Sequence, residues 1–155
     1  MTTSNNHEKI RVPAPILTII HITIAILLGK LMPLPIPAPI FVQWLCLGFA
    51  ALGFILGVLA LIEFRRVRVA LDPKRSTTSF VTSGIYRYTR NPVYLGFVFM
   101  LIGLPLNMGT YWGVILVWPL VTFMNNLVIK HEETQLEKRF KKQYTDYMTN
   151  VRRWL

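Results

Sequence analysis

Three long runs without a charged residue constrain this chain more than any other feature. They cover residues 12–29, 31–62 and 91–129, and they are 18, 32 and 39 residues long. A helix needs ~20 predominantly apolar residues to cross a bilayer. Only 15% of the 155 residues are charged, whereas a soluble domain carries about 25%. The runs therefore predict an all-α integral membrane protein.

Proline and glycine signals divide these runs into four helices. The alternate prolines from Pro33 to Pro39 remove backbone donors and favour an extended connection. The 39-residue run is too long for one span, and residues 106–110 (Leu-Asn-Met-Gly-Thr) interrupt it. We expect a single membrane domain over residues 1–155, with four transmembrane helices. Their expected positions are about 13–32, 40–64, 92–106 and 111–130.

The basic residues predict how these helices are oriented. With four spans, 16 of the 17 Lys and Arg residues lie on the side of the two termini and of the loop 65–90, and Lys30 is the exception. Basic residues accumulate on the cytoplasmic side of membrane proteins. We therefore expect both termini and this loop to be cytoplasmic. Because the basic segments adjoin the spans, anionic lipid is the simpler partner and no nucleic acid is expected.

Isolated ionisable residues near the spans offer little chemistry. The three histidines are far apart and Cys46 is the single cysteine, so no metal-ligand pattern is present and no metal is expected. His21 lies within the first span. Glu63, at the end of the second, is close enough to Arg66 for a simple ion pair. Neither is a strong candidate for a functional site.

Two cytoplasmic segments carry the candidate chemistry. In Thr89–Gly96 (T-R-N-P-V-Y-L-G), Asn91 before Pro92 predicts a helix start, with Asn91 as the side-chain cap and proline at the first helical position. Glu132 and Glu133 directly follow the last span. The cytoplasmic leaflet is negatively charged and disfavours carboxylates at its edge. A position at the membrane surface therefore does not explain these two glutamates.

The residues around these two glutamates follow helical spacing. Asn125 and Asn126 precede the glutamates by seven residues and share their faces, so they either bond a neighbouring helix or line a cavity. An apolar stripe follows, which predicts one amphipathic C-terminal helix on the membrane surface. The stripe consists of Leu136, Phe140, Tyr144, Tyr147 and Val151.

Together these features resemble the isoprenylcysteine carboxyl methyltransferase family in its small prokaryotic form. The resemblance covers residues 71–155 and rests on the order and spacing of several motifs. The motifs are Phe80 to Tyr86 (F-V-T-S-G-I-Y), Arg90 to Gly96 (R-N-P-V-Y-L-G), Glu132 to Leu136 (E-E-T-Q-L), then Phe140, Tyr144 and Tyr147, and the ending Val151 to Trp154 (V-R-R-W).

The resemblance implies a site for S-adenosylmethionine on the cytoplasmic side. Carried over by position, Phe80 and Val81 would line the adenosine end, Tyr86 would close over the cofactor, Asn91, Pro92 and Tyr94 would surround the methionine part, and Glu132 would take the ammonium group. A cofactor with a sulfonium and an ammonium suits a carboxylate and tyrosine faces. Gly96 would leave room for close approach.

Two positions depart from the eukaryotic members of that family. Asn91 stands where they have histidine, so a charged acid or base is absent there. Val128 stands where they place an arginine for the substrate. No catalytic base is evident, and the catalytic residues stay unassigned.

The expected function is a membrane methyltransferase that uses S-adenosylmethionine and a lipophilic small-molecule or lipidated acceptor. Three alternatives stay open. They are a phospholipid N-methyltransferase, a sterol reductase-like enzyme, and a small non-enzymatic four-span transporter or scaffold.

Overall fold

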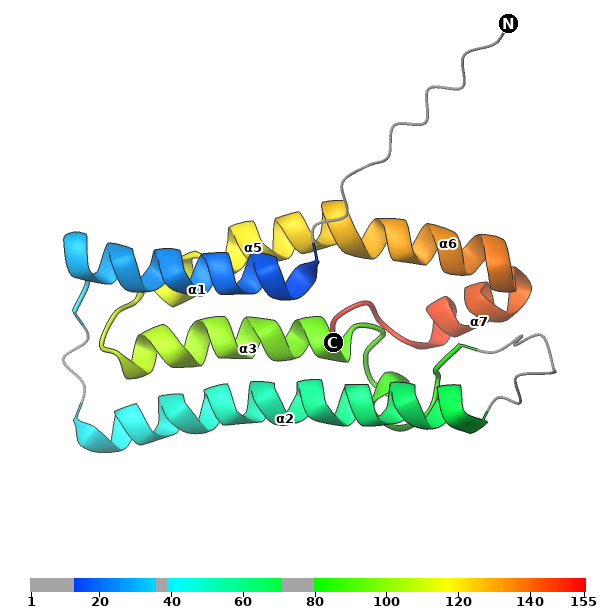
Figure 1. The fold of residues 1–155 in the computed structure, drawn as a ribbon, viewed down its shortest axis with the longest axis horizontal. Helices are drawn as coiled ribbons and strands as arrows, with labels where there is room; N and C mark the ends of the chain where they lie inside the picture. Colours follow the sequence, from blue (N-terminus) through cyan, green and yellow to red (C-terminus); the bar gives the residue numbers. More distant parts are fainter. Residues whose placement is uncertain (1–12, 36–38, 71–79) are drawn as a thin grey trace, which may run out of the picture.

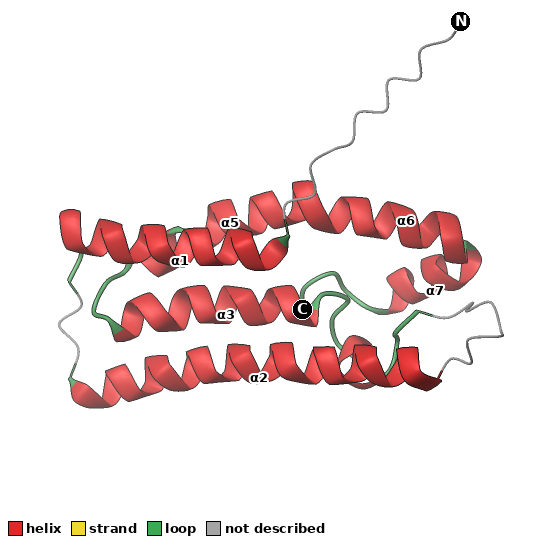
Figure 2. Cartoon of the chain, in the orientation of Figure 1, coloured by secondary structure: helices red, strands yellow, loops and turns green. Residues whose placement is uncertain are grey.

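The computed structural model describes residues 13–35, 39–70 and 80–155. Within them the chain forms helices and no strand, with one isolated bridge between Pro35 and Thr110, so the all-α prediction is confirmed there (Figure 2). The helices are α1 (Ala14–Leu31), α2 (Ile40–Ala70), the 3-10 helix η1 (Gly84–Arg87), α3 (Pro92–Asn107), α4 (Trp112–Ile115), α5 (Val117–Phe123), the π-helical η2 (Met124–Ile129), α6 (Lys130–Phe140) and α7 (Lys142–Asn150). The basic N-terminal tail and parts of the predicted connection 33–39 and loop 65–90 lie outside the described residues.

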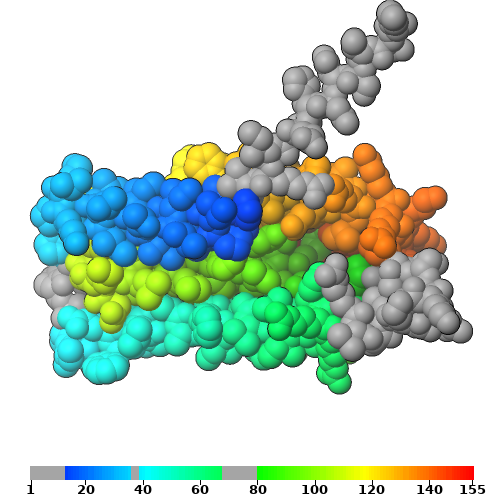
Figure 3. Space-filling view, in the orientation of Figure 1, coloured from blue at the N-terminus to red at the C-terminus, as the bar shows by residue number. Residues whose placement is uncertain are grey.

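The long helices run nearly side by side (Figure 1). Helix α3 lies between α2 on one side and α1 with α5 on the other. In the space-filling view, α1 and α2 form the two edges of the visible face and a strip of α3 shows between them (Figure 3). The C-terminus lies beside the start of α3 (Figure 1). Residues from the two ends of the predicted cofactor region therefore meet at one end of the bundle.

Three helical segments are long and apolar enough to cross a membrane: Ala14–Leu31, Ile40–Val67 and Trp112–Phe140. The apolar helix Pro92–Asn107 is shorter. The predicted break between the third and fourth helices is confirmed, because α3 ends at Asn107 and α4 begins at Trp112. A full count of four spans, and a single domain over residues 1–155, stay predictions.

Large apolar side chains cover the outer faces of the bundle. Ile19, Trp44, Leu45 and Trp118 expose between 63% and 78% of their surface. Soluble proteins rarely expose contiguous apolar patches of this kind. A lipid environment accounts for them, which supports an integral membrane protein.

Glycines set the contact between α2 and α3. A Cβ atom on Gly53 would lie 2.5 Å from the carbonyl oxygen of Gly96, and the converse distance is also 2.5 Å. Only residues without a side chain allow two helix backbones to approach so closely. Gly96 therefore serves helix packing against α2, and the expectation that it leaves room for a cofactor is wrong.

The C-terminal region forms two helices, and the prediction of one continuous amphipathic helix is wrong. Lys141 separates α6 from α7 with a positive φ of 45°. The reversal allows Phe140, Tyr144 and Tyr147 to surround Phe80. A straight helix rises 1.5 Å per residue and would carry Tyr147 away from that ring.

Candidate functional site

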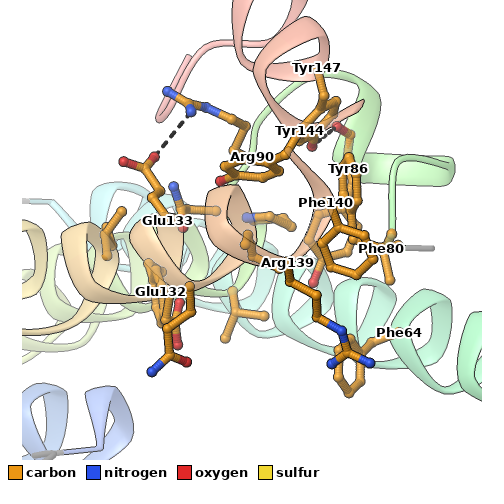
Figure 4. Close-up of a pocket in the computed structure, with 18 of the residues that line it drawn as sticks. Phe64, Phe80, Tyr86, Arg90, Glu132, Glu133, Arg139, Phe140, Tyr144 and Tyr147 are labelled. Carbon is orange, nitrogen blue, oxygen red and sulfur yellow. Dashed lines mark hydrogen bonds and ion pairs between the residues drawn. The ribbon is translucent and has the colours of Figure 1, made fainter. Parts of the chain in front are cut away.

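A cavity of about 700 Å³ lies at the end of the bundle where α2, α3, α6 and α7 meet. Figure 4 shows most of its lining side chains. The structure brings together all seven residues that the sequence predicts for the cofactor, because each of them lines this cavity. They are Phe80, Val81, Tyr86, Asn91, Pro92, Tyr94 and Glu132. Their roles toward a cofactor stay predictions.

A tyrosine and a carboxylate form the polar centre of the wall. Tyr94 lies in the first turn of α3, and its hydroxyl donates to Glu132 of α6, with both carboxylate oxygens 2.9 Å away. These two residues are 38 positions apart in the sequence. The hydrogen bond holds the carboxylate toward the cavity, where a cationic group of a ligand would find it.

Aromatic rings form the opposite side of the cavity. The Phe80 ring lies 5.0 Å from that of Phe140, 5.2 Å from Tyr144 and 5.3 Å from Tyr147, measured between ring centroids. Sequence reasoning recognised the last three as an apolar stripe but did not assign them to a site. The sequence did not indicate that these three rings pack around Phe80, because the chain reversal at Lys141 brings them there.

The loop helix η1 is fixed from two directions. Tyr147 donates its hydroxyl to the backbone oxygen of Tyr86 at 2.7 Å, and the Ser83 hydroxyl donates to the carboxylate of Glu63. Glu63 thus bonds the loop, a contact that the sequence did not indicate. Among the described residues no ion pair joins Glu63 to Arg66, so the expected pair is not formed. Gly84 next to Ser83 has a φ of 58°, a conformation that favours glycine.

Burial raises the pKa values of the hydroxyls of Tyr86, which lies in η1, and of Tyr147, which bonds η1. It raises the pKa of Tyr86 above 10.0, and the negative charges of Glu132 and Glu63 raise it further. The pKa of Tyr147 is raised to about 12, first by burial and then by the neighbouring Tyr144. Both side chains are therefore neutral hydrogen-bond donors at physiological pH.

Asn91 occupies the position before the first residue of α3, as predicted, but it is not a side-chain cap. Its amide Nδ2 instead donates to the backbone oxygen of Arg153 at 3.0 Å. The prediction of capping is wrong because the C-terminal segment supplies a competing acceptor. Pro92 takes the first helical position as expected.

Cavity residues that the sequence did not predict come mainly from α2 and α6. Phe64 and Val67 of α2 line the cavity, and Val67 lies beyond the expected end of that helix at 64, because α2 continues to Ala70. The feature of the sequence that could have indicated these two residues is the apolar pattern of the helix, which continues into the basic loop. Arg90, Val93, Ile129, Glu133, Gln135, Leu136 and Arg139 also line it.

The remaining polar residues of the spans are engaged elsewhere. Asn125 accepts a hydrogen bond from Trp154 Nε1 at 3.2 Å, and Asn126 accepts one from Lys130 Nζ at 2.8 Å. His21 is buried, with Nδ1 2.7 Å from the Leu17 oxygen of its own helix. Neither asparagine lines the cavity. Neither bonds a neighbouring helix as expected, because Asn125 bonds the C-terminal segment and Asn126 bonds a residue four positions further along its own helical run.

A second cavity of about 440 Å³ adjoins the first. The two share Val93, Tyr94, Glu132 and Gln135, so the Tyr94–Glu132 pair forms part of both walls. The remaining lining of the second cavity is mostly apolar. It comprises Pro13, Ala14, Pro15, Phe97, Leu127, Val128 and His131.

The first cavity combines two carboxylates, Glu132 and Glu133, with two arginines, several aromatic faces and apolar residues. Glu133 is paired with arginines, whereas Glu132 is bonded to Tyr94, and a carboxylate among aromatic faces suits an organic cation. In the parts of the chain that the structure describes, no group of three His, Cys, Asp or Glu residues is placed to hold a metal ion. Fold and site together define a helical membrane protein with a cavity of mixed aromatic and charged lining.

The comparison with family models identifies this class more closely. The model of the phospholipid methyltransferase family matches residues 41–143, and the chain belongs to this family. It is a family of integral-membrane methyltransferases to which the isoprenylcysteine carboxyl methyltransferase type belongs, so the resemblance found in the sequence is confirmed. No curated protein and no solved structure matches the chain.

Members of this family use S-adenosylmethionine as their methyl donor. The residues present fit that cofactor, since a carboxylate bonded to a tyrosine faces a cavity that is large enough for a ligand of this size. The protein is therefore a membrane methyltransferase.

Proposed function

We propose that the protein transfers a methyl group from S-adenosylmethionine, bound in the 700 Å³ cavity, to a lipophilic acceptor. One observation carries the proposal. Seven residues from three separate sequence segments, which the motifs alone assign to the cofactor, line a single cavity. When bound, the cofactor supplies an electrophilic methyl group on a sulfonium sulfur.

The chain's own residues would bind and orient the two reactants. Glu132, held by Tyr94, offers a negative charge for the ammonium group. The open amides at the start of α3 can receive a carboxylate, and Phe80 and Val81 offer apolar contacts to a purine. Orientation and exclusion of water then contribute most of the rate, as expected for an in-line displacement.

We also propose that the acceptor occupies the second cavity and arrives from the bilayer. That cavity is mostly apolar and shares the Tyr94–Glu132 wall with the first. The two cavities therefore adjoin at this pair, so ligands bound in them would lie next to each other. A water-soluble acceptor that reacts as fast as its lipid counterpart in detergent would contradict this route.

A phospholipid N-methyltransferase is the second candidate function, and His131 favours it. An ammonium acceptor must lose a proton before it attacks, and imidazole is a suitable proton acceptor near neutral pH. His131 lines the second cavity, with Nε2 2.9 Å from the side-chain nitrogen of Gln135. A His131→Asn variant that loses activity on amine lipids but keeps it on carboxylate lipids would support this acceptor class.

Calorimetry of the purified protein with S-adenosylhomocysteine tests the main proposal. We expect saturable binding of one ligand per chain. Lack of binding by the wild-type protein would remove both methyltransferase functions from this cavity.

A further inference from the structure

The five residues that follow α7 return to the cavity instead of leaving the fold. We call residues 151–155 the C-terminal strap. Helix α7 runs back beneath α6, so the strap ends beside the start of α3 (Figure 1). It crosses the junction between η1 and α3, where Asn91 and Pro92 enter the cavity wall.

The strap bonds this junction through its backbone. The amide of Arg90 donates to the oxygen of Arg152 at 3.0 Å. The oxygen of Arg153 accepts two hydrogen bonds, from Thr89 Oγ1 at 3.2 Å and from Asn91 Nδ2 at 3.0 Å. Three consecutive residues before α3 are thus tied to two consecutive residues of the strap. Thr89 and Asn91 are both buried, so water does not compete for these bonds.

A second set of contacts joins the strap to α6 through charge. Arg153 donates to Glu133 through two nitrogens, Nε to Oε1 at 3.1 Å and Nη2 to Oε2 at 2.5 Å. Arg90 Nη1 lies 3.1 Å from Glu133 Oε1 (Figure 4). The side chains of Glu133 and Arg90 each expose only 12% of their surface. One buried carboxylate therefore holds two arginines from different segments. Loss of Glu133 would leave the buried Arg90 without this partner, and loss of Arg153 would remove the bonds that tie the strap to α6.

Trp154 fastens the end of the strap to the last membrane helix. Its Nε1 donates to Asn125 Oδ1 at 3.2 Å, and Asn125 lies in the π-helical segment η2. A π-helical turn inside a helix is often found at functional sites, because it displaces one residue from the regular register. The strap thus contacts both elements that carry the Tyr94–Glu132 pair.

The two adjacent glutamates consequently have separate tasks. Consecutive residues on a helix point about 100° apart, and Glu132 and Glu133 point to different sides of α6 (Figure 4). Glu132 bonds Tyr94 in the cavity wall, whereas Glu133 pairs with Arg90 and Arg153.

We infer that the C-terminal strap is a positioning element of the cofactor site, and that Glu133 and Arg153 are its positioning residues. The inference rests on the proposed function. The strap holds the start of α3 at a fixed distance from α6, so Tyr94 and Glu132 face the same cofactor. Arg153 does not line the cavity, and Glu133, which does line it, is bonded to Arg90 and Arg153.

The test compares Arg153→Gln with Arg152→Gln, a matched control. Both changes remove one positive charge from the strap, but the side chain of Arg152 is exposed and only its backbone oxygen bonds the junction. We expect Arg153→Gln to weaken S-adenosylhomocysteine binding about ten-fold or more, since it removes two charge-assisted hydrogen bonds that hold the strap against α6. Arg152→Gln should bind within about two-fold of the wild type. Arg153→Lys should recover part of the loss, because lysine keeps the charge without the planar fork.

Hydrogen exchange separates positioning from general stability. In Arg153→Gln, amides of residues 86–91 should exchange faster than in Arg152→Gln, while those of α1 and α2 should not change. Thr89→Val changes a residue that does not line the cavity. It removes the bond that Oγ1 donates to the strap and the bond that Oγ1 accepts from the Asn91 amide. It should weaken binding about two- to ten-fold, as for the loss of one or two hydrogen bonds.

Equal binding by Arg153→Gln and Arg152→Gln would overturn the inference, as would unchanged exchange at residues 86–91. Failure of the wild type to bind S-adenosylhomocysteine would refute the proposed function instead, and the exchange comparison would still decide whether the strap holds this junction. If Arg153→Gln does not fold, Thr89→Val decides, and wild-type binding by it overturns the inference.

Discussion

Glu132 and Tyr94 form the contact on which cofactor binding should depend most. Changing Glu132 to Gln keeps the shape of the side chain but removes its charge. We expect it to weaken S-adenosylhomocysteine binding by about 1.5–3 kcal/mol, the contribution of a hydrogen bond to a charged group. Calorimetry measures the difference directly.

Glu137→Gln is the matched control for this change. Glu137 lies on the same helix, is exposed and does not line the cavity. It should leave the dissociation constant unchanged. Equal losses in the two variants would mean that net charge, and not the Glu132 contact, governs binding.

Tyr147 links the loop helix to α7, and its protonation should be visible in the stability of the protein at high pH. Its folded pKa of about 12 lies above the usual 10.0. The stabilisation is therefore complete below pH 10 and is lost as the pH rises through 12. Thermal unfolding should show Tyr147→Phe less stable than the wild type by about 1 kcal/mol below pH 10.

The difference in stability between Tyr147→Phe and the wild type should shrink between pH 10 and 12. Over this range the wild-type protein loses the stabilisation by the protonated Tyr147 hydroxyl, which the variant does not have. Tyr88→Phe is the control, since the side chain of Tyr88 is exposed, and it should match the wild type throughout. A Tyr147→Phe difference that stays constant up to pH 12 would contradict the assigned origin of the shift.

Residue-level reasoning predicted the members of the site better than their partners. Asn91 and Glu132 line the cavity as expected, because the motif order placed them on elements that meet. The hydrogen bond of Asn91 to Arg153 and that of Glu63 to Ser83 join residues 62 and 20 positions apart. Local propensity says nothing about such partners, since the path of the chain between them decides their proximity.

At the level of elements, the contact between α2 and α3 rests on Gly53. Its hypothetical Cβ would also lie 2.8 Å from Phe99 Cβ. Gly53→Ala should therefore separate the two helices and destabilise the protein by about 1–3 kcal/mol, as overpacking does. Thermal unfolding in detergent measures the loss.

Gly48→Ala provides the comparison within the same helix. A Cβ at Gly48 meets no other atom within 4 Å, so this variant should unfold at or above the wild-type temperature, because alanine favours helix by up to about 1 kcal/mol. If both variants unfold alike, the close approach of the backbones is not what stabilises this helix pair.

The lengths of the apolar runs predicted the positions of the helices. They did not predict the chain reversal after α6. The ends of α1 and α3 agree with the sequence to within one residue. Lys141 carries no glycine or proline signal, yet it turns the chain with a positive φ. The packing of three aromatic rings around Phe80 outweighs its local preference, and this packing depends on a segment some 60 residues earlier.

The molecule as a whole has two different ends. The turn between α3 and α4 lies beside the connection that leaves α1, because Tyr111 N donates to Leu34 O at 3.3 Å and Thr110 bridges Pro35. The C-terminal strap ends beside the start of α3, away from this turn (Figure 1), and the residues that line the 700 Å³ cavity come from the start of α3 and from the elements around it. If α1 and α2 cross the bilayer, α3 and the helix that follows must cross it beside them.

Cysteine labelling tests this four-span arrangement and its orientation. In a Cys46→Ser background, Met108→Cys places a thiol in the exposed turn, and Lys142→Cys places one at the cavity end. Because 16 of the 17 basic residues fall in the segments that the sequence predicts for one side of the membrane, the cavity end should be cytoplasmic. A membrane-impermeant maleimide should then label Met108→Cys in intact cells, and Lys142→Cys only after permeabilisation. Thr2→Cys should behave like Lys142→Cys, because an even number of spans keeps both termini on one side. Labelling of Thr2→Cys and Lys142→Cys from opposite sides would require an odd number of spans and would contradict the four-span prediction.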